Sequence, residues 1–200
     1  MAGDASRRLV VALGGASGAI YGVRFLQQAV RHFDEIYVTL SDNASQVLAT
    51  EMNLRLSSTP TALELIGLDA PQIRFCSREN YFTPPASGSF RHAGMVIIPS
   101  SMGTVGRIAN GISNDLTTRA ADVCLKEGRK LVIVVRETPW NLIHLRNLTA
   151  LAEAGATILP ASPSFYHNPQ TIEDLVDTIV ARTLQCVGVE QEIVGEWKHE

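Results

Sequence analysis

Five short runs of apolar and β-branched residues constrain the fold of this chain more than any other feature of the sequence. They are LVVAL (9–13), IYVTL (36–40), MVIIP (95–99), LVIVV (131–135) and ATILP (156–160). Runs of this length without polar alternation are typical of strands that are buried on both faces of a parallel sheet.

Helical patterns lie between these runs. Ile20, Val23, Leu26 and Val30 follow the first run at helical spacing, and apolar residues repeat in the same way over 172–184. Strands that alternate with helices fold into α/β proteins. We therefore predict a single-domain Rossmann-like (flavodoxin-like) fold, a doubly wound parallel sheet with helices on both faces, over residues 1–200.

The stretch 54–91 interrupts the alternation. It contains four prolines and the small-residue run ASGS (86–89). We expect an elaborated loop over one edge of the sheet, and no composition break marks a second domain.

Charge and hydropathy exclude some partners. With a formal net charge of -3 and a pI near 6.0, the chain has no general attraction to nucleic acid or anionic lipid. No apolar run approaches the roughly 18 residues of a membrane span, so we expect a cytoplasmic protein. The 46% hydrophobic content favours a homo-oligomer that buries surface between its subunits.

The cysteines and histidines predict no metal site. Cys76, Cys124 and Cys186 are odd in number and widely spaced, and the five histidines show no metal-ligand spacing. We expect inert thiols and assign no metal.

Small and polar residues follow the predicted strands. They are GGASGA (14–19), Ser41, SSMGT (100–104), Arg136-Glu137 and, further along, Tyr166-His167. The carboxyl ends of parallel strands meet at one edge of a sheet, where helix N-termini present free N–H groups. The sequence thus predicts a ligand site at this edge.

Each glycine or serine loop also has a structural interpretation. A GGASGA turn serves close packing of a strand and a helix, and SSMGT is compatible with an ordinary N-cap. GGASGA departs from the GxGxxG fingerprint, and no acidic residue directly follows IYVTL. A mononucleotide such as FMN is therefore favoured over NAD.

The charged residues leave similar alternatives open. Arg119, Asp122 and Lys126 share one helical face, which is either a solvated face with an Asp122–Lys126 pair or a place where Lys126 neutralises a phosphate. Arg136-Glu137 ends a buried strand, which favours phosphate or flavin binding and acid–base chemistry.

Two further positions are equally open. Arg182 interrupts an apolar helical pattern and either snorkels to solvent or binds a ligand. Tyr166 and His167 are compatible with packing and capping as well as with a site.

Together the motifs resemble the UbiX and Pad-type flavin prenyltransferases, over nearly the whole chain. The combination of VRETP with FYHxPQ is the most specific signal. The matching segments are GGASGAIYG (14–22), SDNASQVLATE (41–51), PPASGSF (84–90), PSSMGT (99–104), TRAADVCLKE (118–127), VVRETPW (134–140) and FYHNPQTIEDLV (165–176).

The resemblance implies a homo-oligomer, commonly a dodecamer, with active sites between subunits. The implied reaction needs no metal and transfers dimethylallyl from dimethylallyl monophosphate, or alternatively the diphosphate, to N5 and C6 of reduced FMN. The product, prenylated FMN, serves a UbiD-type decarboxylase. The segment from about 185 to 200 is expected to pack on a neighbouring subunit.

The resemblance also assigns residues by position. The FMN contacts are Gly15, Ala16, Ser17, Ser41, Ser101, Met102, Gly103, Thr104 and Arg136. The prenyl-phosphate contacts are Arg119, Lys126, Tyr166 and Arg182. The catalytic residues are Ser17, Glu51, Lys126, Glu137 and Trp197.

The implied roles fit the chemistry, because loss of a phosphate leaves an allyl cation. Fixed cations such as Lys126 would stabilise the departing anion, while Trp197, or alternatively the flavin itself, would meet the diffuse cation with a π face. Ser17 and Glu51 relay the proton removed from C6, and Glu137 protonates the phosphate.

Three positions depart from the family pattern. Asp42 stands where Lys is frequent, which puts anion affinity near Ser41 in doubt. Ser100 replaces a frequent Cys, and Gly128 replaces an Arg.

Two other function classes remain as alternatives. An FMN-dependent cysteine decarboxylase would share the fold, but no PxMNxxM segment is present. A flavin carrier would retain only the FMN contacts, whereas this chain also has the prenyl-phosphate residues.

Overall fold

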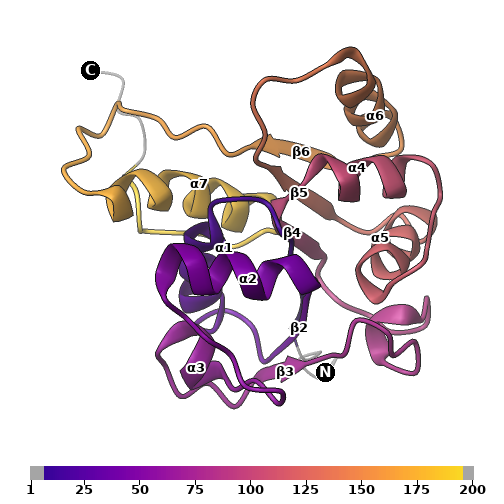
Figure 1. Ribbon diagram of the computed structural model, residues 1–200, viewed down its shortest axis with the longest axis horizontal. Coiled ribbons are helices and arrows are strands. Elements are labelled where there is room, and N and C mark those ends of the chain that lie inside the picture. The colour runs from indigo at the N-terminus through magenta and orange to yellow at the C-terminus, as the bar shows by residue number, and fades with distance from the viewer. Residues whose placement is uncertain (1–6, 196–200) are drawn as a thin grey trace, which may run out of the picture.

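The computed structural model describes residues 7–195, which build a parallel sheet between two layers of helices (Figure 1). The sheet has the order β3-β2-β1-β4-β5-β6, with every pair parallel. Its strands are β1 (Arg8–Leu13), β2 (Glu35–Leu40), β3 (Ile73–Phe75), β4 (Met95–Ser100), β5 (Leu131–Val135) and β6 (Thr157–Pro160). This is the Rossmann order, whose topological switch point lies between β1 and β4.

The helices cover both faces of the sheet. Figure 1 shows α1, α2, α3 and α7 on one side and α4, α5 and α6 on the other. Their bounds are α1 (Ala19–Ala29), α2 (Asp42–Met52), α3 (Ala62–Ile66), α4 (Met102–Ala109), α5 (Leu116–Lys126), α6 (Leu142–Glu153) and α7 (Ile172–Cys186), with a 3-10 helix, η1, at Pro84–Ala86. The predicted doubly wound fold is confirmed.

Two apolar cores explain why the strand runs lack polar alternation. Leu9, Val11 and Leu13 of β1 pack with α1 and α7, whereas Val10 and Ala12 pack on the opposite side with α4 and α5. Successive side chains of a strand point to opposite faces, so a strand covered on both sides needs apolar residues throughout. The five predicted strands begin and end within one residue of the observed ones.

The interpretation of 54–91 as a loop was incomplete. This stretch contains α3 and β3 as well as η1. Helix α3 has only five residues and depends on a capping box between Thr61 and Glu64, and β3 has three residues paired with β2. Elements this short give no usable periodicity, which is why the pattern missed them.

No helix within residues 7–195 is both long enough and apolar enough to cross a membrane.

Candidate active site

The loop after β1 and the N-termini of α2 and α4 meet at the carboxyl edge of the sheet. Ser41 caps α2 by accepting from the Ala44 N–H at 3.2 Å, and Ser101 caps α4 by accepting from the Thr104 N–H at 3.3 Å. Both serines line one cavity of about 280 Å³. Two helix N-termini at one cavity favour binding of an anion.

The cavity brings several predicted FMN contacts together with residues that sequence reasoning missed. Its size lies near the lower end of the roughly 300–1,000 Å³ of ligand pockets, and so suits a phosphorylated chain better than a whole flavin. Its lining residues are Gly15, Ser41, Asp42, Asn43, Arg78, Ser101, Thr104 and Arg107.

Glycines allow the β1 loop to lie directly against its neighbours. A Cβ on Gly14 would collide with the Pro99 carbonyl oxygen, and one on Gly15 would collide with the Asn43 side chain. Gly18 begins α1 with φ of 97°, in the left-handed region that favours glycine. The structure thus uses GGASGA for close packing as well as for lining the cavity.

Gly14→Ala is expected to destabilise the protein by about 1–3 kcal/mol, because backbone atoms cannot yield to the new methyl group. Urea denaturation would measure the free energy of unfolding. Gly106→Ala in α4 is a matched control, because its Cβ would have ordinary contacts and a helix gains about 0.5–1 kcal/mol from this change. Equal stability of the two variants would contradict the prediction.

Glu51 joins the end of α2 to the start of α1. Its Oε2 accepts from the N–H groups of Gly18 and Ala19, both at 2.9 Å. Burial raises the pKa of the Glu51 carboxyl, but hydrogen bonds from the Ser17 hydroxyl and these two N–H groups outweigh burial and hold the pKa below its usual value. An ionised carboxylate therefore lies at the N-terminus of α1.

Arg136 connects β5 to the same cluster. Its Nε donates to the Ser17 carbonyl oxygen at 3.1 Å, although the two residues are 119 positions apart. Glu137, which is half-buried, follows it and accepts from the Thr138 N–H at 3.0 Å. The structure thereby brings together Ser17, Glu51 and Arg136, with Glu137 next in the chain.

Asp115 organises an ion-pair network beside the cavity. Its side chain is almost fully buried, and its Oδ2 lies 2.6 Å from Arg107 Nη1 and 3.4 Å from Arg78 Nε. Asp115 also caps α5 by accepting from the Thr118 N–H at 2.8 Å. The sequence analysis did not find this network, because long-range pairs such as these leave no periodic signal.

The pKa of Asp115 predicts a pH dependence of stability. Burial raises this pKa, but the Thr118 N–H, the Arg107 guanidinium and the Thr118 hydroxyl hold it below the ordinary 3.8. Because the folded-state pKa is depressed, the stabilisation is complete above the unfolded pKa and is lost as the pH falls through the folded value. In urea denaturation between about pH 5 and pH 2, Asp115→Asn is expected to lose less stability than the parent protein. Parallel curves would contradict this expectation.

Arg119 and Lys126 lie on α5 beside the segment 84–90 and do not line this cavity. Arg119 Nε donates to the Ala86 carbonyl oxygen at 3.2 Å, and its Nη1 pairs with Asp122 at 3.1 Å. Lys126 pairs with Glu127. The Asp122–Lys126 pair of the solvated-face interpretation was therefore wrong, since Asp122 pairs toward the start of the helix.

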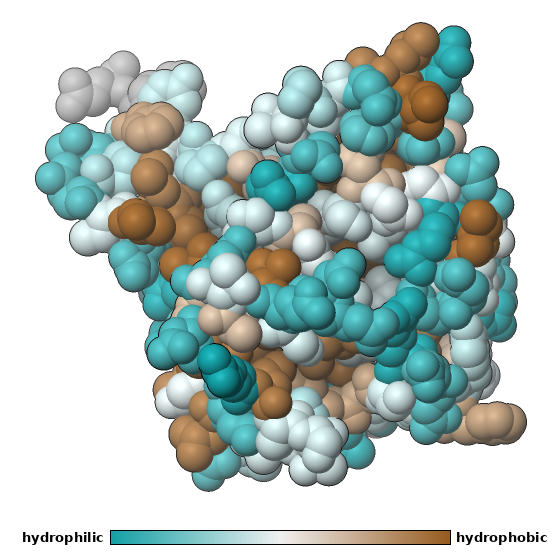
Figure 2. Space-filling model, in the orientation of Figure 1, coloured by the Kyte–Doolittle hydropathy of each residue, from teal (hydrophilic) through white to brown (hydrophobic). Residues whose placement is uncertain are grey.

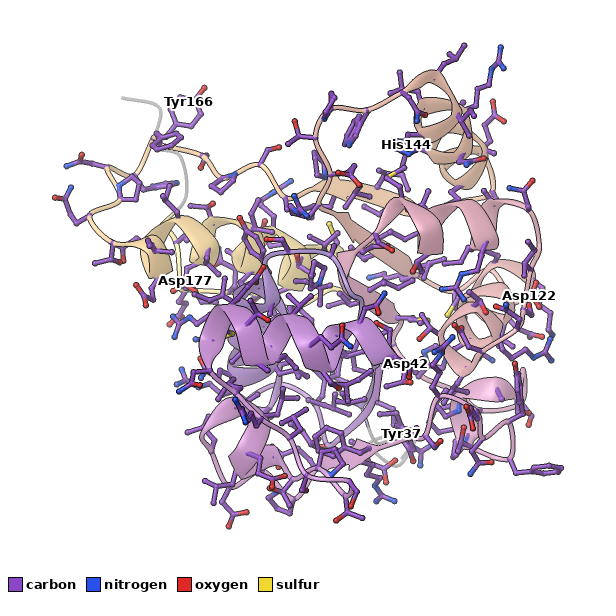
Figure 3. The ribbon with its side chains drawn as sticks, viewed as in Figure 1. Tyr37, Asp42, Asp122, His144, Tyr166 and Asp177 are labelled. Carbon is purple, nitrogen blue, oxygen red and sulfur yellow. The ribbon has the colours of Figure 1, made fainter. Side chains whose placement is uncertain are left out.

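Tyr166 and Arg182 occupy another side of the molecule. Tyr166 is 76% exposed in the connection between β6 and α7. Arg182 of α7 donates to Gln185 Oε1 at 2.6 Å and lines a cavity of about 340 Å³ with Ser164 and His167. Figure 3 shows Tyr166 far from Asp122, the partner of Arg119. One chain alone does not assemble the four predicted prenyl-phosphate contacts.

The remaining predicted residues have simple places. Ala16 and Met102 are buried, and Gly103 is exposed in the first turn of α4.

The three positions that depart from the family pattern also have defined places. Asp42 pairs with Arg78, Ser100 is fully buried at the end of β4, and Gly128 has φ of 62° just after α5. Trp197 lies outside the described residues. Within 7–195, no three His, Cys, Asp or Glu side chains form a group that could hold a metal ion.

Comparison with known proteins adds independent evidence. The Flavoprotein family model matches residues 2–184. The flavin prenyltransferase UbiX of Pseudomonas aeruginosa is 46% identical over 195 residues, which cover 95% of this chain and 93% of that protein. The Escherichia coli UbiX is 41% identical, covering 96% of this chain and 98% of the relative.

Solved structures agree with the sequence relatives. AnUbiX (PadA1), crystallised with FMN and dimethylallyl pyrophosphate, superposes with a TM-score of 0.88 at 37% identity, covering 98% of this chain and 99% of that chain. The peptidyl-cysteine decarboxylase EpiD reaches a TM-score of 0.59 at 18% identity, covering 91% and 98%. The cysteine decarboxylase therefore shares the fold alone.

Proposed function

This chain belongs to the UbiX flavin prenyltransferase family, and from that premise we propose how its residues bind the substrates and move protons. It is a transferase and a flavoprotein. We propose that the acceptor is reduced FMN, that the donor is dimethylallyl monophosphate or diphosphate, and that the prenyl group is joined to N5 and C6 without a metal. The product would serve a UbiD-type decarboxylase.

The main support for this proposal is that predicted FMN contacts from several segments meet at the β1–β4 switch point. A cavity with two serine-capped helix N-termini adjoins the Ser17–Glu51–Arg136 cluster. The helix N-termini suit the phosphate of FMN, and the Arg136 guanidinium suits a flavin carbonyl oxygen. The glycines at 14 and 15 let the β1 loop lie directly against Pro99 and Asn43 at this edge.

When the phosphate leaves the donor, its negative charge must be stabilised by positively charged side chains. Arg119 and Lys126 would stabilise that anion, and Tyr166 and Arg182 would hold it from the other side. Because these two pairs lie on different sides of one chain, we propose that each site takes one pair from a neighbouring copy. Glu137 would protonate the phosphate, and Trp197 would face the allyl cation.

Exposed apolar side chains support assembly into an oligomer. Leu142 and Ile143 of α6 are 60% and 66% exposed, and Trp140 and Leu145 lie beside them. Figure 2 shows apolar side chains at the α6 corner of the molecule. A UbiX-like structure from Escherichia coli O157:H7 is dodecameric, with a TM-score of 0.85 at 36% identity, covering 96% of this chain and 100% of that chain. We propose a dodecamer. In the segment from about 185, which was expected to pack on a neighbour, Val187 and Val189 pack in the core of their own chain, so we propose neighbour contacts only for the residues after Val189.

One assay tests the reaction. The purified protein is incubated anaerobically with reduced FMN and dimethylallyl monophosphate or diphosphate, and mass spectrometry looks for a flavin heavier by one C5 unit. Product without added metal and with chelator present would support the proposal. A protein that binds FMN but yields no adduct with either donor would instead be a flavin carrier.

A further inference from the structure

Two arginines on the wall of the 280 Å³ cavity have no role in the assignments above. Arg78 comes from the connection between β3 and η1, and Arg107 comes from the last turn of α4. Both side chains are partly buried, at 32% and 29% exposure. They share the cavity with Ser41, Ser101 and Thr104, whose hydroxyls also suit an anion.

One carboxylate fixes both guanidinium groups. Asp115 Oδ2 accepts from Arg107 Nη1 at 2.6 Å and from Arg78 Nε at 3.4 Å, while Oδ1 accepts from Thr118 at 2.8 Å. Arg107 Nη2 also donates to Thr104 Oγ1 at 3.3 Å. Asp115 is 4% exposed and hydrogen-bonded through both oxygens, so it is a rigid anchor.

The charges of this cluster favour the binding of an anion. Two arginines around one buried carboxylate, together with the N-termini of α2 and α4, make the inner wall positive. The fourth member, Asp42, pairs with Arg78 but is 83% exposed. An exposed ion pair contributes little free energy, so Arg78 can exchange it for a ligand oxygen at small cost.

We propose that Arg78 and Arg107 bind the phosphate group of FMN and that Asp115 is the positioning residue that orients both. This inference rests on the proposed function, since it names the residues that hold the acceptor's phosphate. It also answers the doubt raised by Asp42, because the cation beside Ser41 comes from another segment of the chain.

The test compares FMN with riboflavin, which lacks the phosphate. Arg78→Gln and Arg107→Gln are each expected to weaken FMN binding about 10- to 100-fold, because a charge-assisted hydrogen bond is lost, and to leave riboflavin binding unchanged. Asp115→Asn keeps the cap of α5 but removes the charge, and should weaken FMN binding about 3- to 10-fold. Calorimetric titration of the intact oligomer measures all the affinities.

Arg24→Gln is the matched control. Arg24 is also partly buried and paired with an aspartate, Asp177, but it lies on α1 and does not line this cavity. Its FMN-to-riboflavin preference should equal that of the parent protein. Arg78→Lys and Arg107→Lys should recover part of the preference, since Lys keeps the charge without the bidentate geometry.

Equal loss of FMN and riboflavin affinity in the Gln variants would overturn the proposal, and so would unchanged FMN affinity. An unchanged preference in Asp115→Asn would reduce Asp115 to a helix cap and overturn its positioning role. A parent protein that prefers FMN strongly but forms no C5 adduct would refute the transferase function alone. A parent protein without that preference that still forms the adduct would refute the phosphate contacts alone.

Discussion

Lys126→Ala is expected to lower kcat for prenyl transfer about 100- to 1,000-fold while leaving FMN affinity unchanged. Removing one fixed charge that stabilises a departing anion has an effect of about this size. Lys126 is exposed and contacts only Glu127 by an ion pair in the described part of the chain, so its loss should not disturb folding. Single-turnover kinetics with saturating FMN measure the change.

Lys130→Ala provides the control, because this lysine is also exposed and lies four residues away. It should react at the parent rate. Lys126→Arg should recover most of the activity, since the charge is kept. If Lys126→Ala reacts as fast as the parent protein, Lys126 is an ordinary solvated side chain and does not neutralise a phosphate.

Mixing variants tests whether the site spans two copies. Oligomers co-assembled from Lys126→Ala and Arg182→Ala chains in equal amounts should contain about one quarter intact sites, because each site draws one residue from each of two chains. Each variant alone should be nearly inactive. Activity of the mixture no higher than that of the single variants would place both residues at one chain's site.

Glu51→Gln is expected to bind FMN normally but to stall before ring closure, with the second step slowed about 100- to 10,000-fold. The depressed pKa keeps Glu51 ionised, and Ser17 connects it by a hydrogen bond to the edge where the flavin would lie. Rapid-quench mass spectrometry and flavin absorbance should show an adduct that carries the C5 unit without the fourth ring. Ser17→Ala should slow the same step.

A purely structural role for Glu51 predicts something different. The amide oxygen of Gln can still accept from Gly18 and Ala19, but it lacks the negative charge that favours the N-terminus of α1, so the variant would then lose about 1 kcal/mol of stability and nothing else. Ring closure at the parent rate, with that modest loss of stability, would refute the proton relay. Glu64→Gln, at another helix cap, controls for general destabilisation.

The sheet could be predicted from the sequence because strands that are buried on both faces consist of uninterrupted apolar residues. LVIVV matches β5 residue for residue. Helix α3 and strand β3 were missed because they are held by a capping box and by pairing with β2, and neither produces a repeating pattern.

The site was predicted unevenly for a similar reason. Loops that follow parallel strands must meet at one edge, so Gly15, Ser41 and Ser101 could be placed together in advance. Arg78 and Arg107 reach that edge through pairs with Asp115, which depend on how the chain folds back on itself. The prenyl-phosphate contacts remain a prediction, because one chain places Tyr166 and Arg182 on a different side of the molecule from Arg119 and Lys126.

The carboxylate of Glu51 places a negative charge at one end of the candidate site, whereas Arg78 and Arg107 place positive charges at the other. Since the first N–H groups of α1 already donate to this side chain, we expect a phosphate to bind at the cavity wall formed by Arg78 and Arg107 and not at α1. We therefore expect a ligand with an anionic tail and a neutral ring system to favour one orientation, with its tail toward the arginines. The charge distribution of the site would thus orient the phosphate and the ring of the ligand before the reaction begins.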